Sequence, residues 1–176
     1  MKKTISVLYA FLASILITTS ALAGGSVKLS SVTFSLGSLI ANGTLTGLGN
    51  SDVTVVLYAK GIPEITCTNY GNSDVPGQSS PMVSASGRQV LPGNNPLRKN
   101  GKSPFGVETY NPSLTWDEAG CPNSNWSARV DFVFWTEATL GIHLGFNNPD
   151  GPILASQNYT CETTRNPDHV TCTPLP

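Results

Sequence analysis

The sequence has few charged residues, few strong helix formers and no long apolar stretch beyond its first two dozen residues. Only 12% of its 176 residues are charged. Without the predicted signal (1–23) discussed below, eight Lys and Arg oppose eleven Asp and Glu, and 8 − 11 gives a net charge of −3. Because sequence-independent nucleic-acid binding depends on a basic excess, we predict no nucleic-acid partner.

The scarcity of Ala, Leu, Glu and Lys argues against a helical bundle. Gly, Pro, Asn, Ser and Thr instead make up almost half of the chain. This composition is typical of an all-β, turn-rich secreted domain. The length after the signal fits one domain, since domains cluster near ~100–150 residues. We therefore expect a single domain over residues 24–176.

The N-terminus has the pattern of a cleaved secretion signal. Lys2 and Lys3 precede an apolar stretch (5–17), and Ala-Leu-Ala at 21–23 fits a cleavage site before Gly24. The apolar stretch is shorter than the ~20 residues that a membrane-spanning helix needs. We expect a secreted or extracellular protein without a membrane span after cleavage, or a periplasmic one if the host has an outer membrane.

Four cysteines follow the signal, and export would place them where disulfides persist. Four thiols allow three pairings. Adjacency along the chain favours Cys67 with Cys121 and Cys161 with Cys172. The second bridge would close a short polar C-terminal segment (161–172).

Metal binding is the alternative use of these cysteines. His169 lies between the last two, but no C-x-x-C occurs and the spacing fits none of the usual zinc patterns. Asn and Asp at 50–52, 72–74 and 147–150 could offer oxygens to calcium, yet they lack the ligand series of a calcium loop and fit turns better. We predict no metal and no cofactor.

Alternation with a period of two predicts half-buried strands. Over 52–60 it turns Val53, Val55, Leu57 and Ala59 inward. Over 126–134 it turns Trp126, Ala128, Val130, Phe132 and Phe134 inward. A change of phase at Ser30-Ser31 indicates a bulge or bend. Further predicted strands are 39–48, 64–68, 82–91, 105–110, 138–146 and 153–159.

Many short strands separated by Gly-, Asn- and Asp-rich turns favour an antiparallel β-sandwich, with an open β-barrel as the alternative. Cys67 should point inward near its strand end, whereas Cys121 lies in a turn. An antibody-type domain would place both cysteines in strands around a core Trp, but Trp116 lies in a polar stretch. The fold is expected to be immunoglobulin-like in architecture at most.

Several segments carry a resemblance to known sequences. They are LTGLGNSDVTV (45–55), CTN (67–69), PGQ (76–78) and AGCPNSNW (119–126). The chain resembles a group of small exported bacterial proteins in which these segments recur in this order. The resemblance covers roughly Gly37 to Leu144 and implies a bacterial source, but it implies no activity, ligand or catalytic residue.

Catalytic patterns are weak. His143 alternates with apolar residues on its predicted strand, which places it on the polar face, and no nucleophile motif accompanies it. Asp117, Glu118 and Glu108 could supply a carboxylate pair for glycoside hydrolysis, but no spacing singles out a working pair. We expect these side chains to be solvated surface groups.

A long connection (69–104) is basic and rich in Gly and Pro. It contains Arg88, Arg98, Lys99 and Lys102 and, between Asp74 and Glu108, no acid. Such a connection, interrupted by one short strand, could contact an anionic polysaccharide or lipid head groups. The alternative is a solvated loop without a partner.

Aromatic side chains offer a second binding hypothesis. Trp116, Trp135, Tyr70 and Tyr110 are predicted at loop or strand-end positions, where exposed rings could stack on sugars. We therefore treat Trp116 and Trp135, with the four basic residues, as candidate ligand contacts.

The sequence predicts a non-enzymatic binding or structural module at or outside the cell surface. Its partner would be an extracellular polysaccharide or another surface protein. The alternatives are a carbohydrate-binding module with exposed Trp and Tyr, a small secreted hydrolase, and self-assembly through an uncovered sheet edge.

Overall fold

A computed structural model describes residues 26–176, so the predicted secretion signal lies outside the described residues. The described chain consists of strands and the turns between them, as its composition predicts. Within this range, no helix is long and apolar enough to cross a membrane.

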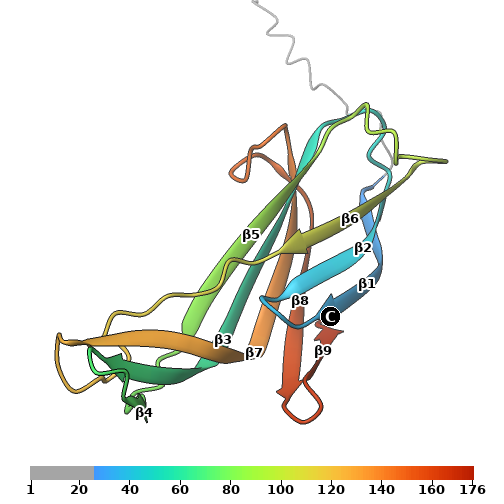
Figure 1. The fold of residues 1–176 in the computed structure, drawn as a ribbon. Helices are drawn as coiled ribbons and strands as arrows, with labels where there is room; N and C mark the ends of the chain where they lie inside the picture. The colour runs from blue at the N-terminus through green and yellow to red at the C-terminus, as the bar shows by residue number, and fades with distance from the viewer. Residues whose placement is uncertain (1–25) are drawn as a thin grey trace, which may run out of the picture.

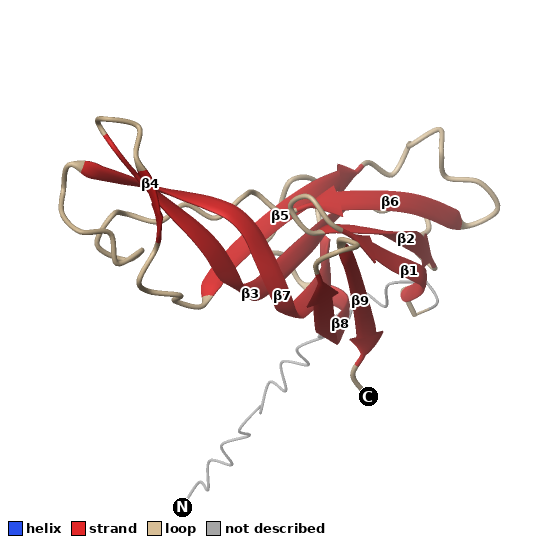
Figure 2. Cartoon of the chain, turned by 60° about the horizontal axis from the view of Figure 1, so that its bottom comes forward, coloured by secondary structure: helices blue, strands red, loops and turns tan. Residues whose placement is uncertain are grey.

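Nine strands form within residues 26–176. They are β1 (Lys28–Ser35), β2 (Ile40–Thr46), β3 (Val53–Asn69), β4 (Asp74–Pro76), β5 (Val83–Leu91), β6 (Lys102–Glu108), β7 (Trp126–Leu144), β8 (Ile153–Thr164) and β9 (His169–Pro174). The first, second and sixth form one antiparallel sheet in the order β1-β2-β6, and the other six form a second antiparallel sheet (Figures 1 and 2). This two-sheet arrangement confirms the predicted sandwich over the open barrel.

The two longest strands, β3 and β7, form the centre of the second sheet. They pair along the whole of β3. On the other edge of β3, β5 pairs with residues 53–61 and β4 with residues 66–68. Each long strand joins two strands that the sequence predicts separately. In β3 the alternation continues through the intervening residues, whereas β7 continues through two bulges.

The core lies between the two sheets. Every odd-numbered residue of β3 from Val53 to Cys67 is buried, so the predicted inner face of 52–60 is confirmed. The largest fully buried side chains are Trp135, Leu39, Leu45, Leu57, Leu91, Leu140 and Ile142. Alternation thus assigns one face of β3 to the core along its whole length.

Strand β7 changes phase twice, which corrects part of the predicted pattern. The register with β3 skips Asp131 and Thr136, so β7 carries an extra residue at each point. Each bulge reverses which side chains face inward. Val133 is therefore buried. The predicted inward positions of Phe132 and Phe134 are wrong, since these residues lie opposite the exposed Glu64 and Ile62 of β3.

The predicted irregularity at Ser30-Ser31 is confirmed. The pairing of β1 with β2 shifts between Ser30 and Thr33, and Ser31 has a positive φ of 53°. The bulge lets apolar residues on both sides of it face the core despite their opposite phases.

Both predicted cysteine pairs are confirmed as disulfides. Cys67 lies in β3 and is fully buried, and Cys121 lies in a turn, as expected. Cys161 and Cys172 lie directly opposite each other in β8 and β9. The predicted disulfide-closed segment 161–172 is thus a hairpin formed by the end of β8 and by β9, and β9 was not predicted.

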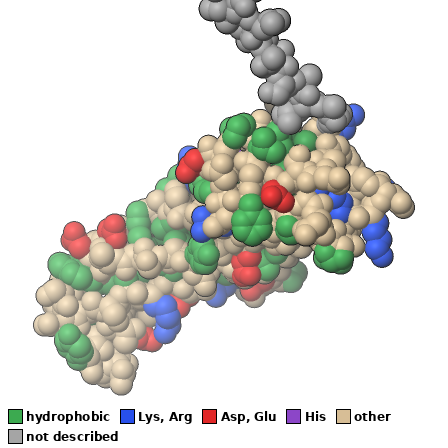
Figure 3. Space-filling view, turned by 90° about the horizontal axis from the view of Figure 1, so that it is seen from above, with side chains coloured by type: hydrophobic (Ala, Val, Ile, Leu, Met, Phe, Trp, Pro, Cys, Tyr) green, Lys and Arg blue, Asp and Glu red, His purple; other side chains and the backbone are tan. Residues whose placement is uncertain are grey.

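The basic connection 69–104 is also more ordered than predicted. It contains β4, the nine-residue β5 and the start of β6, rather than one short strand in a long loop. Beyond the ends of β5 and β8, β3 and β7 continue as a ribbon that carries β4 (Figure 1). We call this extension, residues 62–80 and 111–134, the arm. It gives the molecule its elongated outline (Figure 3).

Candidate functional site

Two exposed tyrosines lie in one row across the outer face of the second sheet. Tyr58 of β3 lies directly opposite Ser86 of β5 and Thr139 of β7. The peptide N–H of Tyr110 donates to the carbonyl of Ser86 at 2.9 Å. Since directly opposed residues lie ~4.5–5.5 Å apart, the row is compact. Tyr58 is 51% exposed and Tyr110 is 76% exposed, so both rings face solvent.

A cleft of about 260 Å³ opens beside this row. Its lining includes Tyr58, Ser86, Arg88 and Tyr110, with Val56 between them. Val56 lies opposite Arg88 and belongs to the row next to that of Tyr58. We call the surface formed by Tyr58, Ser86, Arg88 and Tyr110 the tyrosine groove.

Two further hollows continue the groove on either side. A cleft of about 490 Å³ lies between segments 81–86 and 110–114 and shares Ser86 and Tyr110 with the first. A shallow hollow of about 80 Å³ lies beyond Tyr58, over β3 and β7. The three hollows therefore follow one another, with Tyr110 at one junction and Tyr58 at the other.

Gly87 allows the segment after β6 to pass close to β5, which places Tyr110 on the outer face of the second sheet. A Cβ atom on Gly87 would lie 1.7 Å from the carbonyl oxygen of Glu108, so only glycine lets the end of β6 approach β5 this closely. The next residue, Thr109, exchanges hydrogen bonds with Leu39: its N–H donates at 2.9 Å and its Oγ1 accepts at 3.1 Å. These contacts fix the backbone on which Tyr110 is carried.

The loop between β7 and β8 closes the other end of the groove. The Thr54 hydroxyl donates to the carbonyl of Gly145 and accepts from the N–H of Asn148, both at 2.9 Å. Pro149 then lines the cleft together with Val56, which is buried although it faces outward. The groove floor is therefore apolar while its rim is polar.

Of the charged side chains that the structure describes around the groove, some form ion pairs and Arg88 does not. Lys60 and Glu137 pair at 3.5 Å beside the shallow hollow. Arg88 is exposed and forms no ion pair within residues 26–176. A guanidinium without a carboxylate partner, next to two aromatic rings, can accept an anionic group from a ligand.

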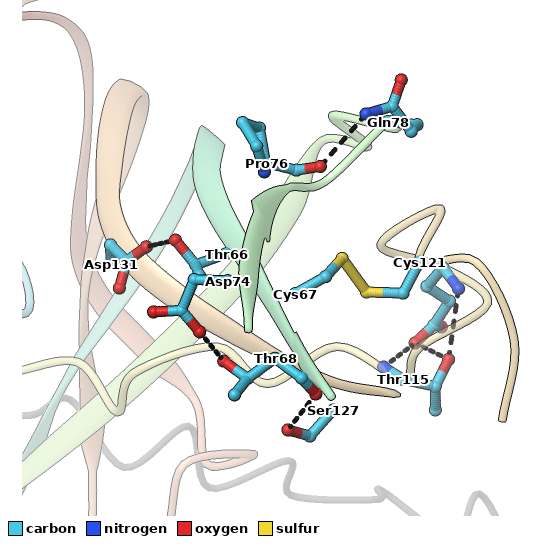
Figure 4. The surroundings of a disulfide bond; sticks show 11 residues. Thr66, Cys67, Thr68, Asp74, Pro76, Gln78, Thr115, Cys121, Ser127 and Asp131 are labelled. Atoms are coloured by element: carbon cyan, nitrogen blue, oxygen red, sulfur yellow. Dashed lines mark hydrogen bonds between the residues drawn. A yellow bond between two sulfur atoms is a disulfide. The ribbon is translucent and has the colours of Figure 1, made fainter. Parts of the chain in front are cut away.

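The Cys67–Cys121 disulfide lies in the arm (Figure 4) and lines none of the three hollows. With Ile65 and Ala119 it forms a small second core, separate from the main one. Leu114, Trp126 and Ala128 pack against this core. The bridge thus holds the loop 111–125 against β3, as the sequence predicts for Cys121.

A single capped turn presents Cys121 to β3. The carboxylate of Glu118 accepts from the N–H and the hydroxyl of Thr115, both at 2.8 Å, and these bonds lower the pKa of Glu118. At the other end Gly120 has a φ of +65°, and the N–H of Cys121 donates to the carbonyl of Trp116 at 2.8 Å. The capping pair T-x-x-E and the glycine define a one-turn motif that strand patterns do not reveal.

The two predicted tryptophan contacts do not form a site. Trp135 is 1% exposed and belongs to the main core, so its prediction as a ligand contact is wrong. The bulges of β7 explain the error, because they turn position 135 inward. Trp116 is 37% exposed in the capped turn of the arm, and it lines none of the three hollows described above.

The four predicted basic contacts are also separated. Arg98 donates to the carbonyls of Gly49 at 2.8 Å and Ser51 at 3.2 Å, so it holds two loops together. Lys99 and Lys102 exchange main-chain hydrogen bonds across a turn and are exposed there. Of the predicted six, Arg88 is the residue that lines the tyrosine groove.

The residues considered for catalysis do not gather in these hollows. His143 is half-buried rather than exposed, and its Nδ1 lies 3.0 Å from the carbonyl oxygen of Gly151. Glu118 lines the 490 Å³ cleft, while Glu108 accepts a hydrogen bond from Ser38. Asp117 lines none of the three hollows. Within residues 26–176, no three His, Cys, Asp or Glu side chains are placed to hold a metal ion.

The alternation over 52–60 leaves Tyr58 on the outer face of its strand, and Tyr110 is predicted at a loop or strand end, but neither pattern brings the two together. An exposed aromatic ring on a polar strand face was the available signal. Comparison with protein-family models, curated proteins and solved structures finds no match, so the resemblance to small exported bacterial proteins stays a prediction.

Proposed function

We propose that the protein is an exported, non-enzymatic binding module that works at or outside the cell surface and holds its ligand in the tyrosine groove. The observation that carries this proposal is the continuous series of hollows joined at Tyr58 and Tyr110. The cleft of about 490 Å³ falls within the ~300–1,000 Å³ that is usual for binding clefts, and the other two hollows, of about 260 and 80 Å³, are smaller.

The composition of the groove supports binding rather than catalysis. Its rim carries tyrosine, serine and arginine side chains. Glu118 is the acid that lines the larger cleft, and Thr115 already occupies its carboxylate. General acid–base catalysis needs a positioned acid and base that are free to exchange protons with a substrate. Along the hollows, the carboxylate of Glu118 is bonded to Thr115 and that of Glu137 is paired with Lys60.

Two disulfides support export, because such bonds persist outside the reducing cytosol. They also suit a rigid module whose binding surface is preformed. The predicted secretion signal points to the same compartment.

Calorimetric titration of the oxidised exported protein tests this function. The probes are a panel of neutral and acidic polysaccharides and a set of short unstructured peptides. We expect at least one probe to bind, and Tyr110→Ala to weaken that binding about tenfold or more, as loss of an interface aromatic does.

Tyr70→Ala is the matched control, because Tyr70 is 88% exposed and lies in the arm. It should bind like the unaltered protein. Equal binding by folded Tyr110→Ala, or absence of binding to every probe, would overturn the proposed function.

A further inference from the structure

We propose that the ligand of the tyrosine groove is a linear polysaccharide whose sugar units carry carboxylates. This inference rests on the proposed function and names the chemical class of the ligand. It follows from three observations: the hollows lie in series, exposed tyrosines stand at their junctions, and Arg88 beside these tyrosines has no ion-pair partner in the described chain.

The serial arrangement indicates a chain ligand. The hollows are joined at Tyr110 and at Tyr58, so each ring borders two of them. A polymer of repeating rings can place successive units in successive hollows, whereas a compact ligand would use only one. The series crosses β5 and β3 on the outer face of the sheet.

The side chains suit sugar rings. Tyr58 and Tyr110 offer large apolar faces to the C–H groups of a sugar. Ser84 and Ser86 are exposed on β5 and line the larger cleft, where their hydroxyls can exchange hydrogen bonds with sugar hydroxyls. The hollows therefore offer both aromatic faces and hydroxyls.

The charge selects an acidic sugar. Arg88 lines the middle cleft with both tyrosines and has no ion-pair partner in the described chain. A planar guanidinium can bind a carboxylate through two parallel hydrogen bonds. An acidic unit placed between Tyr58 and Tyr110 would supply that carboxylate.

An extended polypeptide is the competing ligand. The carbonyl of Ser86 points away from β3 and accepts a hydrogen bond from Tyr110. Because main-chain groups two residues apart point the same way, the N–H and carbonyl of Ser84 also lie on the edge of β5 that faces away from β3. A peptide strand could pair there. Such binding would use the backbone of β5 and would not require the guanidinium of Arg88.

Paired ligands separate these outcomes. We would measure calorimetric affinities for polygalacturonate and for its fully methyl-esterified form, with alginate and hyaluronan as further acidic probes and a chelator present. The acidic polymer should bind about tenfold more tightly than its ester, and added salt should lower the affinity for the acidic polymer but not that for the ester. Arg88→Gln should reduce the affinity for polygalacturonate to that for the ester and leave the ester unchanged. Lys99→Gln, which removes an exposed cation elsewhere, should change neither.

The contrary results are distinguishable. Three results would overturn the polysaccharide class. They are equal affinity for the acid and the ester, an affinity for polygalacturonate that Arg88→Gln leaves unchanged, and binding of peptides but of none of the acidic polymers. Each of these leaves the proposed function standing as long as Tyr110→Ala abolishes whatever binding is seen. Loss of Tyr110 dependence would overturn both.

Discussion

The carboxylate of Asp131 accepts a hydrogen bond from the hydroxyl of Thr66 at 2.5 Å, although Asp131 is the residue that β7 inserts beyond its register with β3. Arg129 also donates to this carboxylate, at 2.6 Å. Burial raises the pKa of Asp131, but the bonds from Thr66 and Arg129 outweigh it and lower the pKa. A bulge and an ion pair therefore lie on the part of β7 whose edge away from β3 pairs with no strand in the described chain.

This arrangement predicts that the open edge of β7 is protected from self-association. Strand β8 pairs with β7 only from Glu137 onward, so no strand of the described chain pairs with the outer edge of residues 126–134. Charges and bulges are common devices that keep such edges apart. We expect the unaltered protein to be monomeric, and Arg129→Thr/Asp131→Thr to give a concentration-dependent mass in sedimentation equilibrium.

The matched control removes an ion pair between two strands whose outer edges are both paired with a further strand. Lys60 and Glu137 lie where β5 and β8 pair with the same two strands. Lys60→Thr/Glu137→Thr should stay monomeric. Association of both double variants to the same extent would show that loss of charge, rather than exposure of the edge, drives it.

The Cys67–Cys121 disulfide should stabilise the arm more than the sandwich. The two cysteines are 54 residues apart, and the loop-entropy estimate for such a loop is ~4 kcal/mol. Because their small core is separate from the main one, Cys67→Ala/Cys121→Ala should raise hydrogen exchange in the arm first. Uniform loss of protection across β3, β5 and β7 would contradict an independent arm.

Arg98 should contribute to stability rather than to binding. Its guanidinium joins the carbonyls of Gly49 and Ser51 and is half-buried. Arg98→Ala should lower the free energy of unfolding by about 1–3 kcal/mol, as loss of a buried donor does. The neighbouring Lys99→Ala should have little effect in the same urea titration. Equal effects of the two changes would restore the view of this loop as a solvated basic segment.

Acid should loosen the capped turn before Cys121. The hydrogen bonds from Thr115 lower the pKa of Glu118, so their stabilising effect is complete above the pKa of an unfolded-chain glutamate, ~4.3, and is lost as pH falls through the lower folded value. Amide protection at residues 119–121 should fall over that interval. In Glu118→Gln the amide protection at residues 119–121 should be independent of pH over that interval. If protection in this variant still falls with pH as it does in the unaltered protein, another group causes the effect.

Gly87 should be intolerant of substitution. A Cβ at this position would meet the backbone of Glu108, which cannot move without displacing Tyr110. Gly87→Ala should therefore cost about 1–3 kcal/mol of stability, as overpacking does. In Gly106→Ala the new atom would meet the flexible Asn42 amide, so thermal unfolding should change less. Equal effects would mean that the crossing at Gly87 can relax.

Local patterns predicted most of the fold. Alternation identified the buried face of β3, and adjacency along the chain identified both disulfides. The bulges at Asp131 and Thr136 were missed because a bulge is defined by the partner strand, which alternation in one strand does not describe. The misplacement of Phe132, Phe134 and Trp135 follows from that single cause.

The candidate site was less predictable than the fold. The tyrosine groove combines residues from β3, β5 and the segment after β6, and their meeting depends on strand register and on the crossing at Gly87. From the sequence alone, Tyr110 is one of four candidate aromatic contacts and Arg88 is one of four candidate basic contacts, and nothing links the two. Register between distant strands was the missing information.

Hydrogen exchange with and without saturating polygalacturonate locates the binding surface on the chain. We expect protection to increase in residues 56–60, 84–88 and 108–114, which line the hollows, and to stay unchanged in the rest of the arm, at 64–70 and 126–132. Protection confined to the arm, or to the turn of Lys99 and Lys102, would contradict the assignment of the binding site to the tyrosine groove.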